Sequence, residues 1–461
     1  MNDCSQAMLV SDVTHRLSEY MAAAARHELP ASVVEKAKHH IIDTLAAMVS
    51  GAPLPAGVKA IDFARGYGGR RVCTVAGSSV QCGPIEAALA NGMLAHADET
   101  DDSHAPSLSH PGCAVVPAAL AAAELFDVSG DRFLRAVALG YDVGPRVTMT
   151  LGVREFFRVG HKSTHSVAGV FGAASAAASV AGLTAQQCRW VLDYAAQQSS
   201  GISSWQRDPD HIEKAFVFGG MPARSGMTAA YLVAAGFTAV DDVFGGPDNF
   251  FAAFAPQADP HGLIDGLGER YELLRSNIKK WSVGSPIQAP LDAIATIRER
   301  TSFEEADVRK VIVHVGDLEA RVVNNRSMPD VCLQHMVAVM LHDGTVSFKT
   351  AHDKERMSDP EIQELRAGVE LIEDEELGRR LPNREAVVRI ELRDGRTLEE
   401  HVKAVRGTPA NAMTAAEVNA KCADLLAPVV GPNRSAELIE AVQSLERAKS
   451  MKHVATLLRA L

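Results

Sequence analysis

The sequence predicts a mostly helical α+β protein, in which a large all-helical domain formed by the N- and C-terminal segments carries an inserted smaller α+β domain. Residues 1–270 and 405–461 show the apolar spacing of helices, whereas residues 271–404 mix strand-like and helix-like stretches. A chain of 461 residues is also too long for one ordinary core. Because helices and strands are segregated along the chain, an α+β fold is favoured over a doubly wound sheet.

The first helices are predicted from an apolar face and from the proline or glycine at their ends. A helix at residues 31–51 closes at Gly51, and its apolar face consists of Val34, Ala37, Ile41, Leu45 and Met48. Pro84 stands at the start of another helix, and Pro111 or Pro117 opens the next one.

Three further helices are expected before residue 270. Residues 132–147 read as a helix broken at its glycine and proline, and residues 222–236 begin with Pro and end with Gly. Residues 166–183 are long and uncharged but consist mostly of Ala, Gly and Ser. Small residues let helices approach closely, so we expect a buried helix here rather than a membrane span.

The inserted segment, residues 271–404, has a residue pattern that differs from that of the helical segments. Residues 308–315 are β-branched and alternating, and residues 386–405 predict a hairpin with Asp394 and Gly395 in its turn. Residues 329–344 between them are expected to form a helix.

The C-terminal tail returns to helices, at residues 414–430 and 435–448 and in a short last segment. Short amphipathic helices need a partner to be stable. The tail is therefore expected to pack back on the first domain.

Composition excludes several classes of protein. The formal net charge of -11 leaves no broad basic face for a nucleic acid or a membrane, and neither is expected as a partner. The seven cysteines form no C-x-x-C pair, which disfavours a disulfide framework, a zinc ribbon and iron–sulfur sites. We expect a reducing compartment, the cytoplasm. The first residues lack the pattern of a secretory leader.

The densest polar cluster is the loop at residues 96–112, which contains His96, Asp98, Glu99, Asp101, Asp102, Ser103, His104 and His110. Three interpretations compete: a solvated acidic loop, a metal site, and an acid/base site in which His or Asp takes a proton from carbon. The compact H-E-x-x-H spacing of zinc enzymes is absent, so no metal is expected.

Two basic segments follow. Arg158, His161 and His165 lie just before or at the start of the small-residue helix, where backbone N–H groups favour an anion. Lys214 lies shortly before a Gly-Gly turn and can bind a carboxylate as a point charge. The alternatives are a basic surface turn and an ordinary exposed lysine.

Seven segments in this order resemble the MmgE/PrpD family over nearly the whole chain. They are residues 41–51, 88–124, 140–147, 165–183, 214–239, 277–294 and 406–418. The resemblance implies a helical domain from both chain ends, an α+β lid, a homodimer, and no metal or organic cofactor. Family members include 2-methylcitrate dehydratase, cis-aconitate decarboxylase and iminodisuccinate epimerase, which act beside a carboxylate of a small polycarboxylate.

The resemblance also implies site residues. The acidic-loop Asp of the family falls on Asp98, or on Asp101 if the loop is shifted, and its hydroxyl residue falls on Ser103. Its His before a helix falls on His110, and its lysine on Lys214. This sequence departs from the family at Gln288, where relatives carry His. Glutamine can orient a substrate but cannot carry a proton.

The expected reaction is proton abstraction next to a carboxylate. His110 is the preferred acid/base, oriented by Asp98 unless that carboxylate accepts the proton itself, and His165 is a second candidate. Lys214, with Arg158 or Lys279, would neutralise carboxylate charge, and His104, His161, Gln288, Asp101 and Ser103 complete the expected substrate contacts. A 2-methylcitrate dehydratase-like hydro-lyase is favoured. The alternatives are an epimerase, a cis-aconitate-type decarboxylase and a non-catalytic polycarboxylate-binding dimer.

Overall fold

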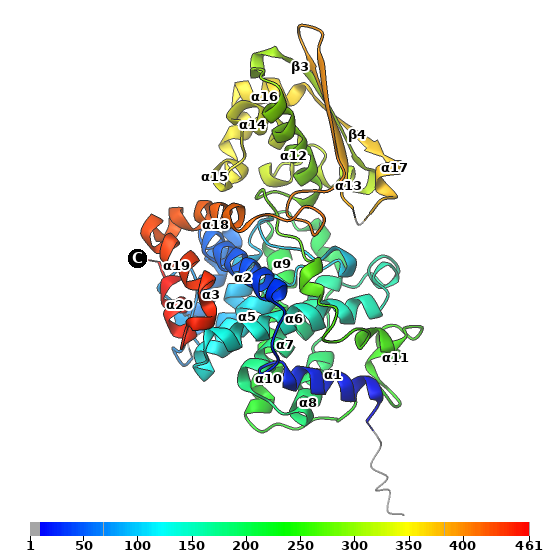
Figure 1. Ribbon diagram of the computed structural model, residues 1–461, viewed down its shortest axis with the longest axis vertical. Helices are drawn as coiled ribbons and strands as arrows, with labels where there is room; N and C mark the ends of the chain where they lie inside the picture. Colours follow the sequence, from blue (N-terminus) through cyan, green and yellow to red (C-terminus); the bar gives the residue numbers. More distant parts are fainter. Residues whose placement is uncertain (1–9, 68, 382, 461) are drawn as a thin grey trace, which may run out of the picture. The chain divides into compact units, whose positions relative to one another are not determined.

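The computed structural model describes residues 10–67, 69–381 and 383–460 (Figure 1). Unit 1 consists of the described residues of Met1–Ala97, Asp102–Arg275 and Leu426–Leu461, and unit 2 of Asp98–Asp101 and the described residues of Ser276–Leu425. Unit 1 is almost entirely helical and unit 2 is α+β, so the predicted fold class is confirmed. The predicted lack of a secretory leader rests mostly on residues 1–9, which include Cys4 and lie outside the described residues.

The second unit differs from the predicted segment 271–404 at both ends. It also includes most of helix α18 (Ala415–Val430), whose side chains form hydrogen bonds with other residues of unit 2. Asp424 accepts a hydrogen bond from the Phe348 N–H at 2.8 Å, and Lys421 donates to the Thr100 carbonyl at 3.0 Å.

Unit 1 is built from helices, several of which begin at a proline or end at a glycine. The predicted helices at 31–51 and from Pro84 are confirmed. The helices are α1 (Asp12–Ala23), α2 (Ala31–Gly51), α3 (Pro55–Tyr67), α4 (Pro84–Ala95), α5 (Gly112–Phe126), α6 (Gly130–Thr150), α7 (Thr164–Ala181), α8 (Ala185–Gln197), α9 (Ile212–Ala215), α10 (Met221–Ala234) and α11 (Phe250–Phe254). Strands β1 (Cys73–Thr74) and β2 (Gln81–Cys82) form a small antiparallel pair.

Helix α7 lies at the centre of unit 1, packed against α5, α6 and α10 (Figure 1). It is buried along nearly its whole length, so the prediction of a buried small-residue helix is confirmed. Among the described residues no single helix is long and apolar enough to cross a bilayer, and only the pair α2–α3, bent by 85°, passes such a test by length and composition.

The predicted break in residues 132–147 is wrong, because α6 runs continuously through Pro145. Its glycines serve close packing. A Cβ at Gly144 would lie 2.3 Å from the Ala168 carbonyl oxygen, and one at Gly140 would lie 2.7 Å from that of Gly172. Tight packing on α7 therefore outweighs the helix-breaking tendency of these residues.

The C-terminal helices α19 (Pro432–Gln443) and α20 (Met451–Leu457) belong to unit 1. Helix α19 packs on α2, and α20 packs on α5. Backbone hydrogen bonds anchor this tail, from the Gly130 N–H to the Ala448 carbonyl at 2.8 Å and from Met451 to Val128 at 3.0 Å.

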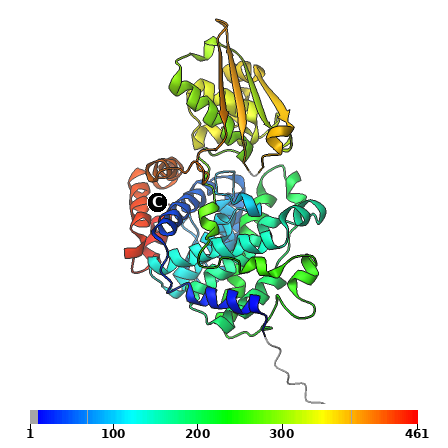
Figure 2. The ribbon, with the colours of Figure 1, turned by 45° about the vertical axis from the view of Figure 1, so that its right-hand side comes forward.

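Unit 2 contains a four-stranded sheet of order β4-β3-β5-β6 (Figure 2). Strand β3 (Val308–Gly316) pairs with β5 (Ala386–Leu392), which forms the predicted hairpin with β6 (Thr397–Val402). Gly395 in its turn has φ 92°. Strand β4 (Val369–Asp374), parallel to β3, was not predicted.

Helices cover one face of this sheet (Figures 1 and 2). Helix α12 packs on β5 and β6, and α14 packs on β4 and on α12 and α16. Buried Val, Ile, Leu and Met side chains of these elements form the core of the unit. The helices are α12 (Ser285–Arg300), α13 (Asp317–Val323), α14 (Leu333–Asp343), α15 (Phe348–His352), α16 (Pro360–Ala367) and α17 (Glu375–Gly378).

Candidate active site

Three histidines from three elements of unit 1 gather around the ring of Phe218. His96 follows α4, His110 precedes α5, and His165 is the second residue of α7. Their ring centroids lie 4.5, 5.4 and 3.7 Å from that of Phe218. We call His96, His110, His165 and Phe218 the histidine cluster.

The three imidazoles of the cluster also contact one another. His110 lies 5.1 Å from His96 and 5.3 Å from His165, measured between ring centroids. His110 and His165 are half-buried, whereas His96 is fully buried. The cluster therefore brings three imidazoles, each of which can carry a proton, into contact with one another.

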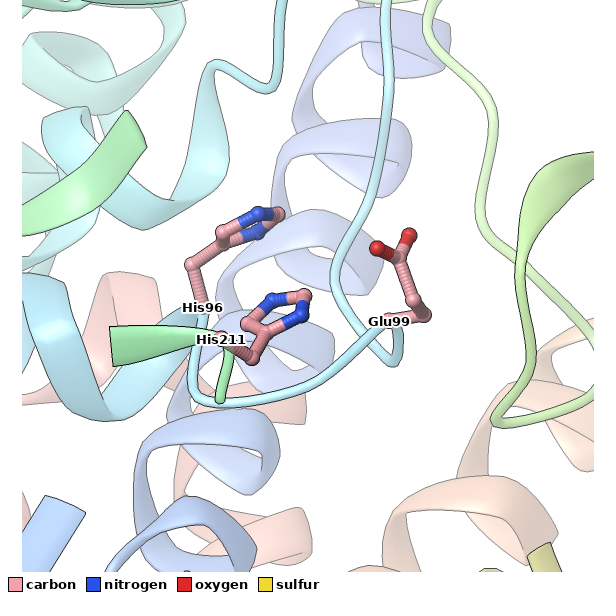
Figure 3. A group of neighbouring side chains, drawn as sticks. All are labelled: His96, Glu99 and His211. Carbon is pink, nitrogen blue, oxygen red and sulfur yellow. The ribbon is translucent and has the colours of Figure 1, made fainter. Parts of the chain in front are cut away.

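A fourth histidine, His211, extends the cluster. Its ring lies beside that of His96 in Figure 3, with the centroids 5.1 Å apart. It precedes α9 in a left-handed backbone conformation, with φ 59°, which is uncommon for a residue other than glycine. Such strained positions are frequent at functional sites. Sequence reasoning missed His211, and its only signal was its position three residues before Lys214.

Lys214 supplies positive charge to the cluster, as its predicted role requires. Its Nζ lies 5.3 Å from the centroid of Phe218 and 5.8 Å from that of Trp205. Asp208 accepts a hydrogen bond from the Lys214 N–H at 2.8 Å, which fixes the backbone there. A cation beside several imidazoles can hold a carboxylate while a proton moves.

The basic segment before α7 contributes only His165 to the cluster. Arg158 lies in a π-helical turn, Glu155–Val159, and is exposed. His161 is exposed as well and has φ 51°. Since both side chains face solvent in unit 1, the substrate contacts predicted for Arg158 and His161 gain no support from the geometry.

His104 and Ser103 lie in the same loop as His110 but in different environments. His104 is fully buried, with Nδ1 2.8 Å from the Ser107 hydroxyl and Nε2 3.2 Å from a Glu272 carboxylate oxygen. Burial lowers the pKa of His104, against the opposing effect of Glu272. Both ring nitrogens are engaged, which favours a structural role over the predicted substrate contact. Ser103 is half-buried.

Glu99 and Asp101 belong to unit 2 and are held by Lys279 of the same unit. Glu99, drawn in Figure 3, accepts from Lys279 through its backbone oxygen at 2.8 Å, and its carboxylate lies 3.4 Å away. Asp101 lies 3.7 Å from the same ammonium group. Burial would lower the pKa of Lys279, but these carboxylates raise it. The positive charge of Lys279 is thus balanced by two carboxylates of the protein, which argues against its predicted role in neutralising the charge of a substrate.

Asp98 forms a buried ion pair with His352, a residue that sequence reasoning missed. Their atoms Oδ2 and Nε2 lie 2.9 Å apart, and Thr100 donates two hydrogen bonds to Asp98. Burial opposes the charged form of His352, yet Asp98 raises its pKa to about 9. Burial likewise opposes ionisation of Asp98, but His352 and Thr100 lower its pKa. No signal in the sequence links two residues so far apart.

Gln288 has a structural role in unit 2. Its side-chain nitrogen donates to the carbonyls of Trp281 and Val283 at 2.7 and 2.9 Å, and its oxygen accepts from the Trp281 N–H at 3.1 Å. The side chain is buried and fixes the turn before α12. This environment argues against the predicted substrate contact of Gln288.

Within the described residues of either unit taken alone, no three His, Cys, Asp or Glu side chains have metal-compatible spacing. The described cysteines are all buried.

Comparison with known proteins gives evidence of the family that is independent of the structure. The MmgE/PrpD N-terminal domain matches residues 15–262, and the MmgE/PrpD C-terminal domain matches residues 281–447. The cis-aconitate decarboxylase of Aspergillus terreus is 24% identical, over 97% of this chain and 96% of its own. The human cis-aconitate decarboxylase is 25% identical, over 79% and 77%. A cis-aconitate decarboxylase-like protein of Aspergillus oryzae is 25% identical, over 66% and 67%. The chain therefore belongs to the MmgE/PrpD family.

Proposed function

We propose that this protein is a lyase that acts on a small polycarboxylate, with decarboxylation of cis-aconitate or a close analogue as its leading reaction. The observation that carries this proposal is the histidine cluster with Lys214 over the same aromatic ring. The names of the relatives, at 24–25% identity, support the reaction class.

In the proposed reaction one carboxylate leaves as CO2. The electron pair of the broken C–C bond stays on the molecule, the double bond shifts, and a carbon takes up one proton. A cation that holds a retained carboxylate stabilises the negative charge that develops, and we assign this role to Lys214.

His110 is the proposed proton donor. It is half-buried and contacts both His96 and His165, so a proton that it delivers can be replaced from a neighbouring imidazole. His165 is less suited to this step because its ring stacks on Phe218, with the two planes only 15° apart. A positioned acid of this kind contributes about 10²–10⁴-fold to the rate.

Dehydration of a 2-methylcitrate-like substrate, the reaction favoured from the sequence, is the second candidate. It needs a base for the α-proton and an acid for the departing hydroxyl. Two imidazoles with centroids 5.3 Å apart, those of His110 and His165, would offer both.

The test is proton NMR in deuterated water with cis-aconitate, 2-methylcitrate, citrate and iminodisuccinate as substrates. The proposal predicts that cis-aconitate loses one carboxylate and that the product carries deuterium on one carbon. Formation of an alkene from 2-methylcitrate would favour dehydration, and stereochemical exchange of iminodisuccinate would favour an epimerase. Binding of these acids without any turnover would contradict the lyase proposal.

A further inference from the structure

The carboxylate of Asp102 joins three elements of unit 1. One oxygen accepts a hydrogen bond from the Gly112 N–H, the first residue of α5, at 3.0 Å. The other oxygen lies 2.5 Å from His40 Nδ1 on α2 and accepts from the Tyr141 hydroxyl on α6 at 2.5 Å. Asp102, His40 and Tyr141 are all fully buried.

Both side-chain donors hold their protons at neutral pH. Burial lowers the pKa of His40 to about 4, so the ring is neutral, and its Nδ1 must carry the proton because a carboxylate only accepts. Burial raises the pKa of Tyr141, and Asp102 raises it further. The Asp102 carboxylate thus has fixed partners on both oxygens, which makes its position well determined.

Glycine at position 112 allows this arrangement. A Cβ there would lie 2.5 Å from the Thr44 hydroxyl, 2.7 Å from that of Tyr141 and 2.8 Å from Asp102 Oδ1. The backbone N–H of Gly112 is one of the unpaired donors at the start of a helix, and a carboxylate satisfies it well.

We infer that Asp102 is a positioning residue for His110, which it fixes by closing the loop 102–112 onto the start of α5. His110 lies two residues before Gly112, and its carbonyl accepts from the Cys113 thiol at 3.1 Å. With Gly112 and Cys113 both holding this turn, the His110 backbone has little freedom. The inference deepens the proposed function and rests on His110 as the proton donor.

The test is the substitution Asp102→Asn, which keeps the shape but places an amide NH2 where a carboxylate oxygen accepted. We expect kcat to fall about 10²-fold with KM little changed, because displacements near 1 Å cost that much in a proton-transfer site. Tyr141→Phe removes one donor and should give a smaller fall in kcat. NMR of histidine labelled at Cε1 reports the surroundings of the His110 ring, and the Cε1 chemical shift of His110 should change in Asp102→Asn.

The matched control is Glu124→Gln at the other end of α5. Glu124 is also a buried carboxylate, and it accepts from the Thr74 N–H at 2.9 Å and from the Thr74 hydroxyl at 2.8 Å. This variant should keep the wild-type kcat and the wild-type chemical shift of His110 even if its melting temperature falls.

Several outcomes decide between a positioning and a purely structural role. Wild-type kcat and an unchanged His110 chemical shift in folded Asp102→Asn would overturn the inference, whatever the loss in stability. If that variant does not fold, the same two readouts on Tyr141→Phe decide. If the wild-type protein turns over none of the tested acids, the proposed function fails. The NMR chemical shift of His110 still decides, in that case, whether Asp102 positions the His110 ring.

Discussion

At the scale of single residues, the candidate site centres on one aromatic ring. Phe218 contacts the imidazoles of His96, His110 and His165 and also lies under the ammonium of Lys214. Stacking restricts the rotation of the rings, and the ammonium group of Lys214 adds a positive charge that can bind a carboxylate. Proton carriers and an anion partner are thus held in one place.

Substitution of Lys214 tests its assigned role. Lys214→Ala should raise KM for cis-aconitate about tenfold or more, because a hydrogen bond to a charged group is worth roughly 1.5–3 kcal/mol. Lys214→Arg keeps the charge and should recover part of the loss. Initial rates over a range of substrate concentrations measure both. Equal KM and kcat values for Lys214→Ala and the wild type would remove this residue from the mechanism.

At the scale of elements, prediction from sequence succeeds where the signal is local and fails where it depends on a distant part of the chain. Helix ends marked by Pro84 and Gly51 were predictable, since capping is local. The continuity of α6 through Pro145 was not, because it depends on α7, which lies elsewhere in the chain. Strand β4 was missed because its pairing with β3 is equally non-local.

Gly144→Ala tests the close contact between α6 and α7. The new methyl group would lie 2.3 Å from the Ala168 carbonyl oxygen, so the helices must separate. Overpacking of this kind lowers the free energy of unfolding by about 1–3 kcal/mol. Gly66→Ala is the matched control, since that exposed helical glycine has open space around it and should leave stability unchanged or raise it by up to about 1 kcal/mol. Equal denaturation midpoints for the two variants would contradict this account.

The ion pair of Asp98 with His352 predicts how the stability of unit 2 depends on pH. The stabilisation from His352 is complete below its unfolded pKa of 6.5 and is lost as pH rises through about 9. The stabilisation from Asp98 is present above its unfolded pKa of 3.8 and is lost as pH falls through the lowered folded value. His352→Gln should therefore cost about 3–5 kcal/mol at pH 7, and the difference from wild type should shrink by pH 10.

Denaturant unfolding at several pH values measures this effect. His342→Gln is the control, because its pair with Glu305 at 2.7 Å is partly exposed and should contribute less than about 1 kcal/mol. A cost of His352→Gln that is constant from pH 7 to pH 10 would show that the pair is not the source.

At the scale of the whole molecule, the sequence predicted the class of fold and the family, and it predicted part of the candidate site. His110, His165 and Lys214 were predicted as catalytic residues, and their side chains lie together in unit 1. Lys279 and Gln288 were also proposed to contact substrate, but their partners Glu99 and Trp281 lie within the protein. Residue type indicates which chemistry is available, whereas burial and hydrogen-bond partners decide whether it is free to act.

The net charge of -11 gives the molecule a field that would repel the proposed polycarboxylate substrate, so local cations would have to overcome it. Lys214 lies against the histidine cluster, whereas Lys279 is already balanced by Glu99 and Asp101.

The central claim is that the histidine cluster transfers a proton to a polycarboxylate, and His110→Gln tests it most directly. Turnover of cis-aconitate in deuterated water is followed by NMR for the wild type, for His110→Gln, and for His261→Gln, an exposed histidine of unit 1 that serves as the control. We predict deuterated product with the wild type and the control, and a rate about 10²–10⁴-fold lower with His110→Gln. Deuterated product formed at the wild-type rate by His110→Gln would contradict the account.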